Sequence, residues 1–421
     1  MSSSAPPTAK MQKGVGGVIL HFRLEEDTVL YDFDNVPERR GTGSFKVDFA
    51  EEMGHAPDEL PMWVADMDFP SPPGVIEAIC RYAQRGYFGY SDAMDGYYDA
   101  VLGWFESRHG IAYERDWLLK TPGVVFAINN AVLAYTEPGD AVMIQTPVYY
   151  PFGMAAKFNN RKLVENELVY TPGASPEYEI DFDDFERKIA DNDVKLFILC
   201  SPHNPVGRVW SPDELRRMGE ICLRHGVRIV ADEIHCDLVM PGHRHTPFLT
   251  ACPEASSSCV VCTAPSKTFS IAGLTTSNIF IPDAQARKSY RFQLARIGSN
   301  SINILGIVAC QAAYESGAEW LDQAIGYIQG NVDFAQRFLA ERLPQLHMVE
   351  LQGTYLVWID MSALGMAQAE LDAFVKDKAK LWLDPGSMFG GDAGQFQRFN
   401  FACPRSTVEE ALLRLERAIN G

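Results

Sequence analysis

Short apolar runs alternate with amphipathic segments along most of the chain. Five runs have the length and composition of buried strands, at residues 141–145, 196–200, 227–231, 259–263 and 278–281. Helical periodicity precedes or separates them, at residues 75–85, 96–109, 123–135 and after Ser211, where Ser-Pro-Asp-Glu is a helix-start signal. The alternation predicts an α/β fold, with a largely parallel sheet that helices cover on both faces.

The pattern changes after Pro282. A long helical stretch runs towards Arg342 with a break at residues 298–303, and strand and helix patterns are then mixed up to the C-terminus, with a strand at 355–359 and helices at 367–380 and 407–420. This mixture predicts a second, smaller α+β domain. The predicted organisation is a flexible N-terminal extension (1–28), an N-terminal segment of the small domain with a linker (29–74), a large domain (75–315) and a C-terminal small domain (316–421).

Composition narrows the function without naming it. The chain has 421 residues and a net charge of −18, which argues against nucleic acid or a membrane surface as the main partner, because both attract basic proteins. No apolar run approaches the roughly 18 residues of a membrane span. The nine cysteines are an odd number spread over a long chain. We therefore expect free thiols and a cytoplasmic location rather than a disulfide framework.

Chemically distinctive residues follow one predicted strand after another. Tyr149, Asn204, Asp232 and Lys267 each come just beyond such a run. Each alone has an ordinary interpretation, as a rim aromatic, a turn, a helix cap or a solvated lysine. Parallel strands, however, bring their carboxyl ends to one edge, where ligands bind. A pyridine cofactor with a phosphate suits the series, since a lysine can bond to its aldehyde, an aspartate can keep its ring nitrogen protonated, an aromatic can stack on the ring and an asparagine can donate to the ring oxygen.

These motifs lie within longer strings that carry a family resemblance. The chain resembles fold-type I pyridoxal-5′-phosphate enzymes of the class I/II aminotransferase superfamily, and within them the MalY/PatB family of cystathionine β-lyases. The resemblance covers about residues 29–421. The strings that carry it include Leu60–Phe69, Gln145–Phe152, Ser201–Trp210, Asp232–His235, Ala264–Phe269 and Asn400–Arg405. Those at Trp63–Phe69 and Ala264–Phe269 are specific to the family, and the one at Ser201–Arg208 marks the superfamily more broadly.

The resemblance implies a seven-stranded, mostly parallel sheet, bound pyridoxal phosphate and a homodimer with shared active sites. It assigns catalytic roles to Lys267, Tyr149 and Asp232. The residues that it implies for cofactor binding are Lys267, Asp232, Asn204, Tyr149, the backbone of Gly123, Val124 and Val125, Ser266, His235, and Tyr90, which would reach the phosphate of the neighbouring subunit.

The resemblance also implies a substrate site. Arg398 would bind the α-carboxylate of an amino-acid substrate, with Ala65 close to it, and Arg405 is the alternative arginine. Asp66 and Asp68 are expected to be structural. His235 stays open between tuning the lysine and being a satisfied polar residue behind it.

The chain departs from the family pattern at three places. Thr275 stands where many aminotransferases carry an arginine that clamps the phosphate, which favours a lyase. Lys46-Val47-Asp48 replaces a usual Lys-Trp-Asp, and residues 303–306 lack a usual phenylalanine before Gly306.

Other motifs predict no additional chemistry and no metal site. Cys259-x-x-Cys262 lies in an apolar run and is expected to hold buried thiols. His243 and His245 are expected to be solvated loop residues. Gly41-Thr42-Gly43 does not open a dinucleotide-binding fingerprint.

The implied activity is β-elimination on cystathionine or a related S-substituted cysteine, which gives a thiol, pyruvate and ammonia. Two alternatives stay open. One is an aminotransferase with the same cofactor, and the other is a lyase with an additional regulatory role in binding another protein.

Overall fold

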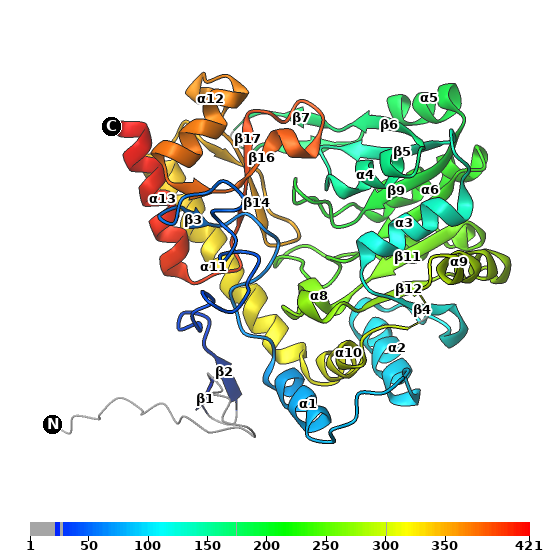
Figure 1. Cartoon of the computed structure of the whole chain (residues 1–421). Helices are drawn as coiled ribbons and strands as arrows, with labels where there is room; N and C mark the ends of the chain where they lie inside the picture. Colours follow the sequence, from blue (N-terminus) through cyan, green and yellow to red (C-terminus); the bar gives the residue numbers. More distant parts are fainter. Residues whose placement is uncertain (1–21, 26–27, 174, 300) are drawn as a thin grey trace.

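The computed structural model describes residues 22–25, 28–173, 175–299 and 301–421. Two β-sheets with their own helices occupy opposite sides of the molecule, and the long helix α11 (Ala318–Arg342) runs along the side of the smaller one (Figure 1). Most of the extension predicted over residues 1–28 lies outside the described residues. None of the helices in the described ranges is both long and apolar enough to cross a membrane.

The larger sheet has seven strands. Their spatial order is β4 (Leu118–Thr121), β12 (Ser277–Phe280), β11 (Cys259–Thr263), β10 (Arg228–Asp232), β9 (Val194–Cys200), β5 (Ala141–Thr146) and β6 (Lys162–Glu167). Only β12 runs antiparallel to its neighbours in this sheet. The predicted α/β class with a mostly parallel sheet is confirmed.

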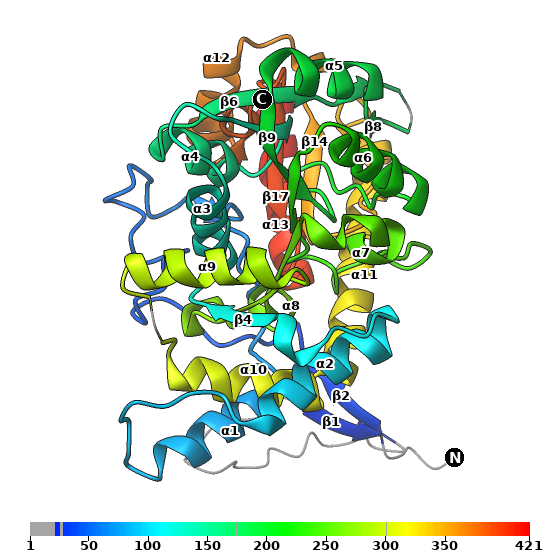
Figure 2. The ribbon, with the colours of Figure 1, turned by 90° about the vertical axis from the view of Figure 1, so that its right-hand side faces the viewer.

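Alternating side chains of the strands build two separate cores. On β9, Leu196 and Ile198 join one apolar cluster, and Phe197 and Leu199 join the other. Figure 2 shows α3 (Val124–Tyr135), α4 (Pro151–Phe158) and α9 (Ala284–Arg296) on one side of the sheet and α6 (Pro212–Arg224) and α7 (Phe248–Ala251) on the other. Burial on both faces explains why these strands are continuous apolar runs.

Local end signals account for several boundaries. Ser211 caps α6 with a complete capping box, in which its side chain accepts from the Glu214 backbone and the Glu214 side chain accepts from the Ser211 backbone.

The helical stretch after Pro282 is three helices, α9, α10 (Ile304–Ser316) and α11. The break predicted at 298–303 is present. A second break, at Gly317, was not predicted. A Cβ there would come within 2.4 Å of the Phe269 ring, so the helix junction requires glycine.

The smaller sheet is antiparallel. Its order is β13 (His347–Met348), β14 (Leu356–Asp360), β17 (Phe396–Asn400) and β16 (Asp384–Pro385). The helices α11 and α13 (Arg405–Asn420) accompany it in Figure 1. Beside it, β15 (Leu381–Trp382) pairs in parallel with β3 (Leu60–Pro61). This pair brings the N-terminal segment against the C-terminal one, so that residues 60–61 and 381–382 lie side by side.

The remaining elements lie around these sheets. Two hairpins occur, and the helix predicted at 367–380 is divided into an α-helix and one π-turn. The elements are β1 (Phe22–Glu25), β2 (Thr28–Tyr31), β7 (Val169–Thr171), β8 (Glu177–Glu179), α1 (Pro73–Ala83), α2 (Asp95–His109), α5 (Phe182–Asn192), α8 (Pro265–Thr268), α12 (Gln368–Ala373), the π-turn Phe374–Lys378, and 3₁₀ turns at Arg115–Trp117, Pro253–Ser257, Ala272–Leu274, Ser362–Leu364 and Gly386–Phe389.

Candidate active site

The carboxyl ends of β5, β9, β10 and β11 lie side by side. The four residues that follow or end these strands in the sequence, Tyr149, Asn204, Asp232 and Lys267, lie there. The loops beyond β5 and β9 are joined directly, because the Tyr149 backbone N–H donates to the Asn204 carbonyl at 3.0 Å. Burial raises the pKa of the Tyr149 phenol to about 12, so the hydroxyl keeps its proton at neutral pH.

Asp232 is the last residue of β10 and is buried. One carboxylate oxygen accepts from the Ile234 backbone N–H at 3.0 Å. Burial raises the pKa of this carboxyl to about 7, and the positive charge of Lys267 offsets only part of that effect. No salt bridge to Asp232 occurs among the described residues, so a positively charged ligand atom would find an acidic partner here.

Lys267 lies on the four-residue helix α8, directly beyond β11. Its Nζ donates to the Ala65 carbonyl at 2.6 Å. Burial lowers the pKa of Lys267 to about 8, with Asp66 and Asp232 opposing this effect and Arg398 adding to it. The neutral amine that a nucleophile or a general base requires is therefore much easier to reach near physiological pH than for an ordinary lysine.

Side chains on both sides fix the segment that presents the Ala65 carbonyl. Asn400 Nδ2 donates to the carbonyls of Val64 and Asp66, each at 2.8 Å, and Arg39 pairs with Asp66 at 2.5 Å. These contacts fit the structural role expected for Asp66. They also explain how a residue more than 200 positions from Lys267 in sequence reaches it.

Arg398 lies on β17 and is buried. Its Nη1 donates to Asn204 Oδ1 at 2.9 Å, and its Nη2 donates to the Trp63 carbonyl at 3.1 Å and to the Asp384 carboxylate. Its Nε is buried and has no hydrogen-bond partner among the described residues. The contact with Asn204 joins the smaller sheet to the edge of the larger one, so that Arg398, Asn204, Asp232 and Lys267 form one cluster.

Sequence reasoning missed Asp384 and the Trp63 carbonyl. Asp384 could have been suspected from its position, because it is a single acidic residue directly after the apolar run Leu381–Leu383. The alternative arginine, Arg405, donates instead to Asn331 Oδ1 at 2.6 Å, at the start of α13.

His235 is buried in the loop after β10. Its ring meets Tyr355 edge-on, with centroids 6.1 Å apart, and its Nδ1 has no hydrogen-bond partner in the described part of the chain. Burial, with Lys267 and Arg398 nearby, lowers the pKa of the imidazole to about 3. The ring is therefore neutral at physiological pH, and the unpartnered Nδ1 does not fit a fully satisfied polar residue.

The start of α3 offers backbone donors. Gly123 precedes the helix, no side chain of the described residues caps its first turn, and a Cβ on Gly123 would meet none of their atoms within 4 Å. Val124 is buried and Val125 is exposed. A helix start of this kind suits a phosphate group. Ser266, on α8 beside Lys267, is half-buried. Thr275 has a φ of 49° and follows the 3₁₀ turn Ala272–Leu274. Gly306 packs on this turn, and a Cβ at position 306 would lie only 2.3 Å from the Leu274 carbonyl oxygen, so this position requires glycine.

Tyr90 is fully exposed in this chain, which separates it from the buried cluster around Lys267. It lines a surface hollow with its neighbours Phe88 and Ser91 and with residues 301–305, including Asn303, which caps α10. The departure at residues 303–306 thus lies at the start of α10 and forms part of that hollow.

Other motifs have structural explanations. Cys259 and Cys262 are buried free thiols, as predicted. The prediction that His245 is solvated is wrong, because its side chain is buried, with Nε2 3.4 Å from Glu233 Oε2. The Asp48 carboxylate accepts from four consecutive backbone N–H groups, at residues 41–44, which accounts for the glycines of Gly41-Thr42-Gly43.

The residues present fit pyridoxal phosphate. Four features lie at the carboxyl ends of the strands of the larger sheet: a buried carboxyl without a salt bridge (Asp232), a lysine with a lowered pKa (Lys267), an imidazole nitrogen without a hydrogen-bond partner (His235) and a helix start without a side-chain cap (Gly123), each judged among the described residues. They match, in turn, a protonated ring nitrogen, an aldehyde, a ring substituent and a phosphate.

Fold and site together define a fold-type I pyridoxal-phosphate enzyme. The chain belongs to the aminotransferase class I and II family, which it matches over residues 58–415. It is 43% identical to cystathionine β-lyase PatB of Bacillus subtilis, over 92% of this chain and 100% of that protein. It is 32% identical to protein MalY of Escherichia coli, over 93% and 100%. The crystal structure of cystalysin from Treponema denticola, which contains pyridoxal 5′-phosphate, superposes with a TM-score of 0.89 at 38% identity, over 93% of this chain and 99% of that one.

Proposed function

We propose that this protein is a pyridoxal-phosphate-dependent carbon–sulfur β-lyase that converts cystathionine or a related S-substituted cysteine into a thiol, pyruvate and ammonia. One observation carries the proposal. The buried Arg398, which can bind an α-carboxylate, donates to Asn204, on the sheet edge that also holds Lys267 and Asp232. The similarity to a β-lyase over almost the whole chain selects this reaction among those that the site could perform.

The residues divide the work of holding the cofactor. Lys267 would bond to its aldehyde, Asp232 would pair with its ring nitrogen, Asn204 would donate through Nδ2 to the ring oxygen and Tyr149 would stack on the ring. The start of α3 and Ser266 would hold the phosphate, and His235 would lie beside the ring. When bound, pyridoxal phosphate supplies an electron sink for the carbanion that proton removal creates.

The remaining steps belong to protein groups. Arg398 orients the substrate by its α-carboxylate, and the Ala65 carbonyl keeps the Lys267 amine directed towards the site. Lys267 Nζ, once the substrate amino group has replaced it on the aldehyde, would take the proton from the substrate Cα, for which its pKa of about 8 is suitable. The thiolate would leave from Cβ with the electrons of the C–S bond, and water would convert the remaining fragment into pyruvate and ammonia.

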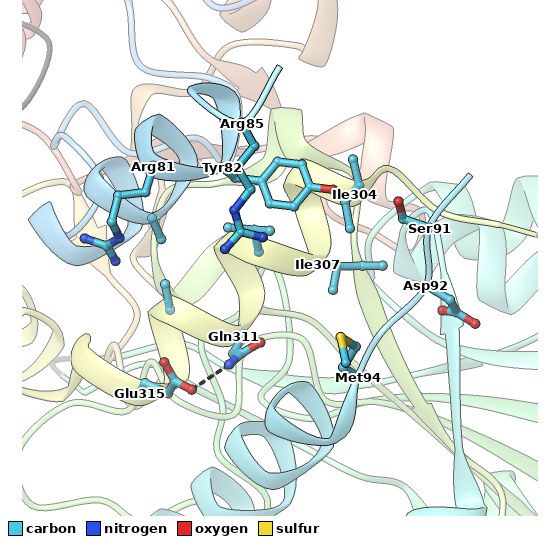
Figure 3. Close-up of a pocket in the computed structure, with 13 residues that line it drawn as sticks. Arg81, Tyr82, Arg85, Ser91, Asp92, Met94, Ile304, Ile307, Gln311 and Glu315 are labelled. Atoms are coloured by element: carbon cyan, nitrogen blue, oxygen red, sulfur yellow. Dashed lines mark hydrogen bonds between the residues drawn. The ribbon is translucent and has the colours of Figure 1, made fainter. Parts of the chain in front are cut away.

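We also propose a cytoplasmic homodimer in which Tyr90 of one subunit reaches the phosphate of the other. Tyr90 and its neighbours Tyr87, Phe88 and Met94 are exposed apolar side chains on one loop, and such clusters mark interfaces. Figure 3 shows the adjoining cleft, which is lined by Arg81 and Tyr82 of α1, by Arg85 just beyond α1, by Ser91 and Asp92, and by residues of α10. All nine cysteines, which lie in the described ranges, are free, as suits a reducing compartment.

The decisive experiment separates a lyase from an aminotransferase. Purified enzyme with bound cofactor is given cystathionine, cystine or a cysteine conjugate, and pyruvate is measured with and without an added keto acid. Release of pyruvate without a keto acid supports the lyase. A strict requirement for the keto acid would identify an aminotransferase instead.

Replacing the lysine tests the site itself. Lys267→Ala should lower turnover at least a thousandfold, because general-base and covalent roles are lost together, and should shift the absorption band of the bound cofactor. Lys188→Ala, which removes a lysine at the surface, is the control. Retention of elimination activity in Lys267→Ala would refute the assignment.

A further inference from the structure

A buried hydrogen-bond network lies behind the cluster around Lys267. We infer that Asp237 and Thr268 are positioning residues, which lock the short helix carrying Lys267 to the segment that follows Asp232 and carries His235. The inference rests on the proposed roles of Lys267 and Asp232, and extends them to two residues that contact neither cofactor nor substrate.

The Asp237 carboxylate is surrounded by donors from two other parts of the chain. One oxygen accepts from Trp104 Nε1 at 2.9 Å and from His109 Nε2 at 2.7 Å, both on α2. The other oxygen accepts from Thr268 Oγ1, on α8, at 2.8 Å. Arg108 Nε lies 3.8 Å away. Asp237, Thr268 and His109 are all buried, so these bonds are shielded from water.

The need for such a lock follows from the length of α8. The helix has four residues, too few to be stable by its own hydrogen bonds. Lys267 and Thr268 are adjacent on it, so the hydroxyl bond to Asp237 fixes the turn next to the reactive amine. Asp237 ends the turn that follows Asp232, the last residue of β10. The Thr268–Asp237 bond therefore ties the turn beside Lys267 to the segment that follows Asp232.

The charge of Asp237 makes the lock strong. The hydrogen bonds from His109 and Thr268, with Arg108 nearby, outweigh burial and hold the pKa of Asp237 below its usual value. Bonds to an ionised acceptor are about twice as strong as neutral ones. His109, Cys236 and Asp237 lie close enough together to suggest a metal site. The donors already directed at both carboxylate oxygens favour a hydrogen-bond network instead.

Thr268→Val tests the inference, because it removes the hydroxyl and keeps the shape. In the enzyme with bound cofactor, kcat should fall about ten- to a hundredfold with KM little changed, since misplacing a catalytic group by about 1 Å has an effect of that size. The absorption of the bound cofactor should change, and the midpoint of its pH titration should shift. Thr268→Ser, which restores the hydroxyl, should restore both readouts.

Thr136→Val is the matched control. Thr136 is a buried threonine that donates to the Val132 carbonyl at the far end of α3. Its variant should lose stability without any change in absorption or in its pH midpoint. If Thr268→Val does not fold, Asp237→Asn carries the same test through the same readouts.

Two results would overturn the inference. The first is a Thr268→Val enzyme with the wild-type kcat and the wild-type absorption titration. The second is a Thr268→Ser enzyme as impaired as Thr268→Val. Failure of the proposed function would be seen separately, as wild-type enzyme that releases no pyruvate, because the absorption readout requires only bound cofactor.

Discussion

The two halves of the proposed active site are built in opposite ways. The cofactor half, with Tyr149, Asn204, Asp232 and Lys267, comes from loops that follow neighbouring strands of one sheet. The carboxylate half combines segments far apart in the chain, because Arg398 reaches the carbonyl of Trp63, 335 positions away, and the carboxylate of Asp384. The first arrangement follows from the fold, and the second depends on how two chain segments meet.

The halves also differ electrostatically. Asp232 is buried without a salt bridge among the described residues, and its pKa is raised to about 7. Arg398 is equally buried but already has an ionic partner in Asp384. The cofactor half therefore carries an unfavourable charge that a bound cation would relieve, while the carboxylate half is prepared before any ligand arrives. Three substitutions test this difference.

Asp232→Asn should have the largest effect. It should raise the stability of the cofactor-free protein and lower the activity of the protein with bound cofactor. A carboxyl whose folded-state pKa is raised makes the folded protein less stable as pH rises from its usual value near 4 to the folded value of about 7. A shift of that size corresponds to about 4 kcal/mol. The cofactor-free variant should therefore be more stable than wild type at pH 8 and not at pH 4, while activity with cofactor falls by orders of magnitude.

Chemical unfolding of cofactor-free protein at the two pH values measures this directly. Asp372→Asn is the control, since burial also raises the pKa of Asp372 but the residue lies away from the sheet edge, beside Gln397. A cofactor-free Asp232→Asn protein that is less stable than wild type at pH 8 would mean that the carboxylate is compensated within the chain, and the contrast between the halves would fail.

The same contrast explains what the sequence could and could not predict. The strands β5, β9, β10 and β11 are buried on both faces, so they stand out as apolar runs, and the residues after them could be found by counting. The strand β6 was missed because it is an outermost strand of the sheet, paired on one side only. Half of its residues are exposed, and these carry charged side chains, so they form no apolar run.

Pairings between distant segments leave no local trace. The family pattern singled out Arg398, but Asp384 and the Trp63 carbonyl acquire their roles only because β16 pairs with β17 and β15 pairs with β3. Ala65 was expected near the substrate carboxylate, and the contact of its carbonyl with the Lys267 amine was not predicted. The hydrogen bond between Thr268 and Asp237 also joins two short segments, and no periodic pattern in the sequence indicates that these segments are in contact.

Arg398→Lys should have the next largest effect and should act on substrate binding. A lysine keeps the charge but loses the planar fork that can contact Asn204, Asp384 and a carboxylate together. Losing one charged hydrogen bond costs about 1.5–3 kcal/mol, so KM should rise about ten- to a hundredfold with a smaller change in kcat. Arg405→Lys, in the same domain, is the control. Unchanged KM and kcat/KM would remove Arg398 from the carboxylate site.

Asp384→Asn should have the smallest effect and should show whether the carboxylate half is prepared in advance. Asparagine keeps a hydrogen-bond acceptor for Arg398 but leaves the buried guanidinium without its compensating charge. A bound α-carboxylate would replace that charge. Saturating L-alanine should therefore stabilise the variant more than it stabilises wild type, as measured by thermal unfolding with bound cofactor.

Equal stabilisation of the two proteins by L-alanine would place the ligand carboxylate elsewhere than on Arg398. Because burial raises the pKa of Asp384 despite the ion pair, the stability of the ligand-free variant does not by itself distinguish the two halves. The ligand distinguishes them, because only in the carboxylate half does a bound anion replace a charge that the protein itself supplies to its buried cation.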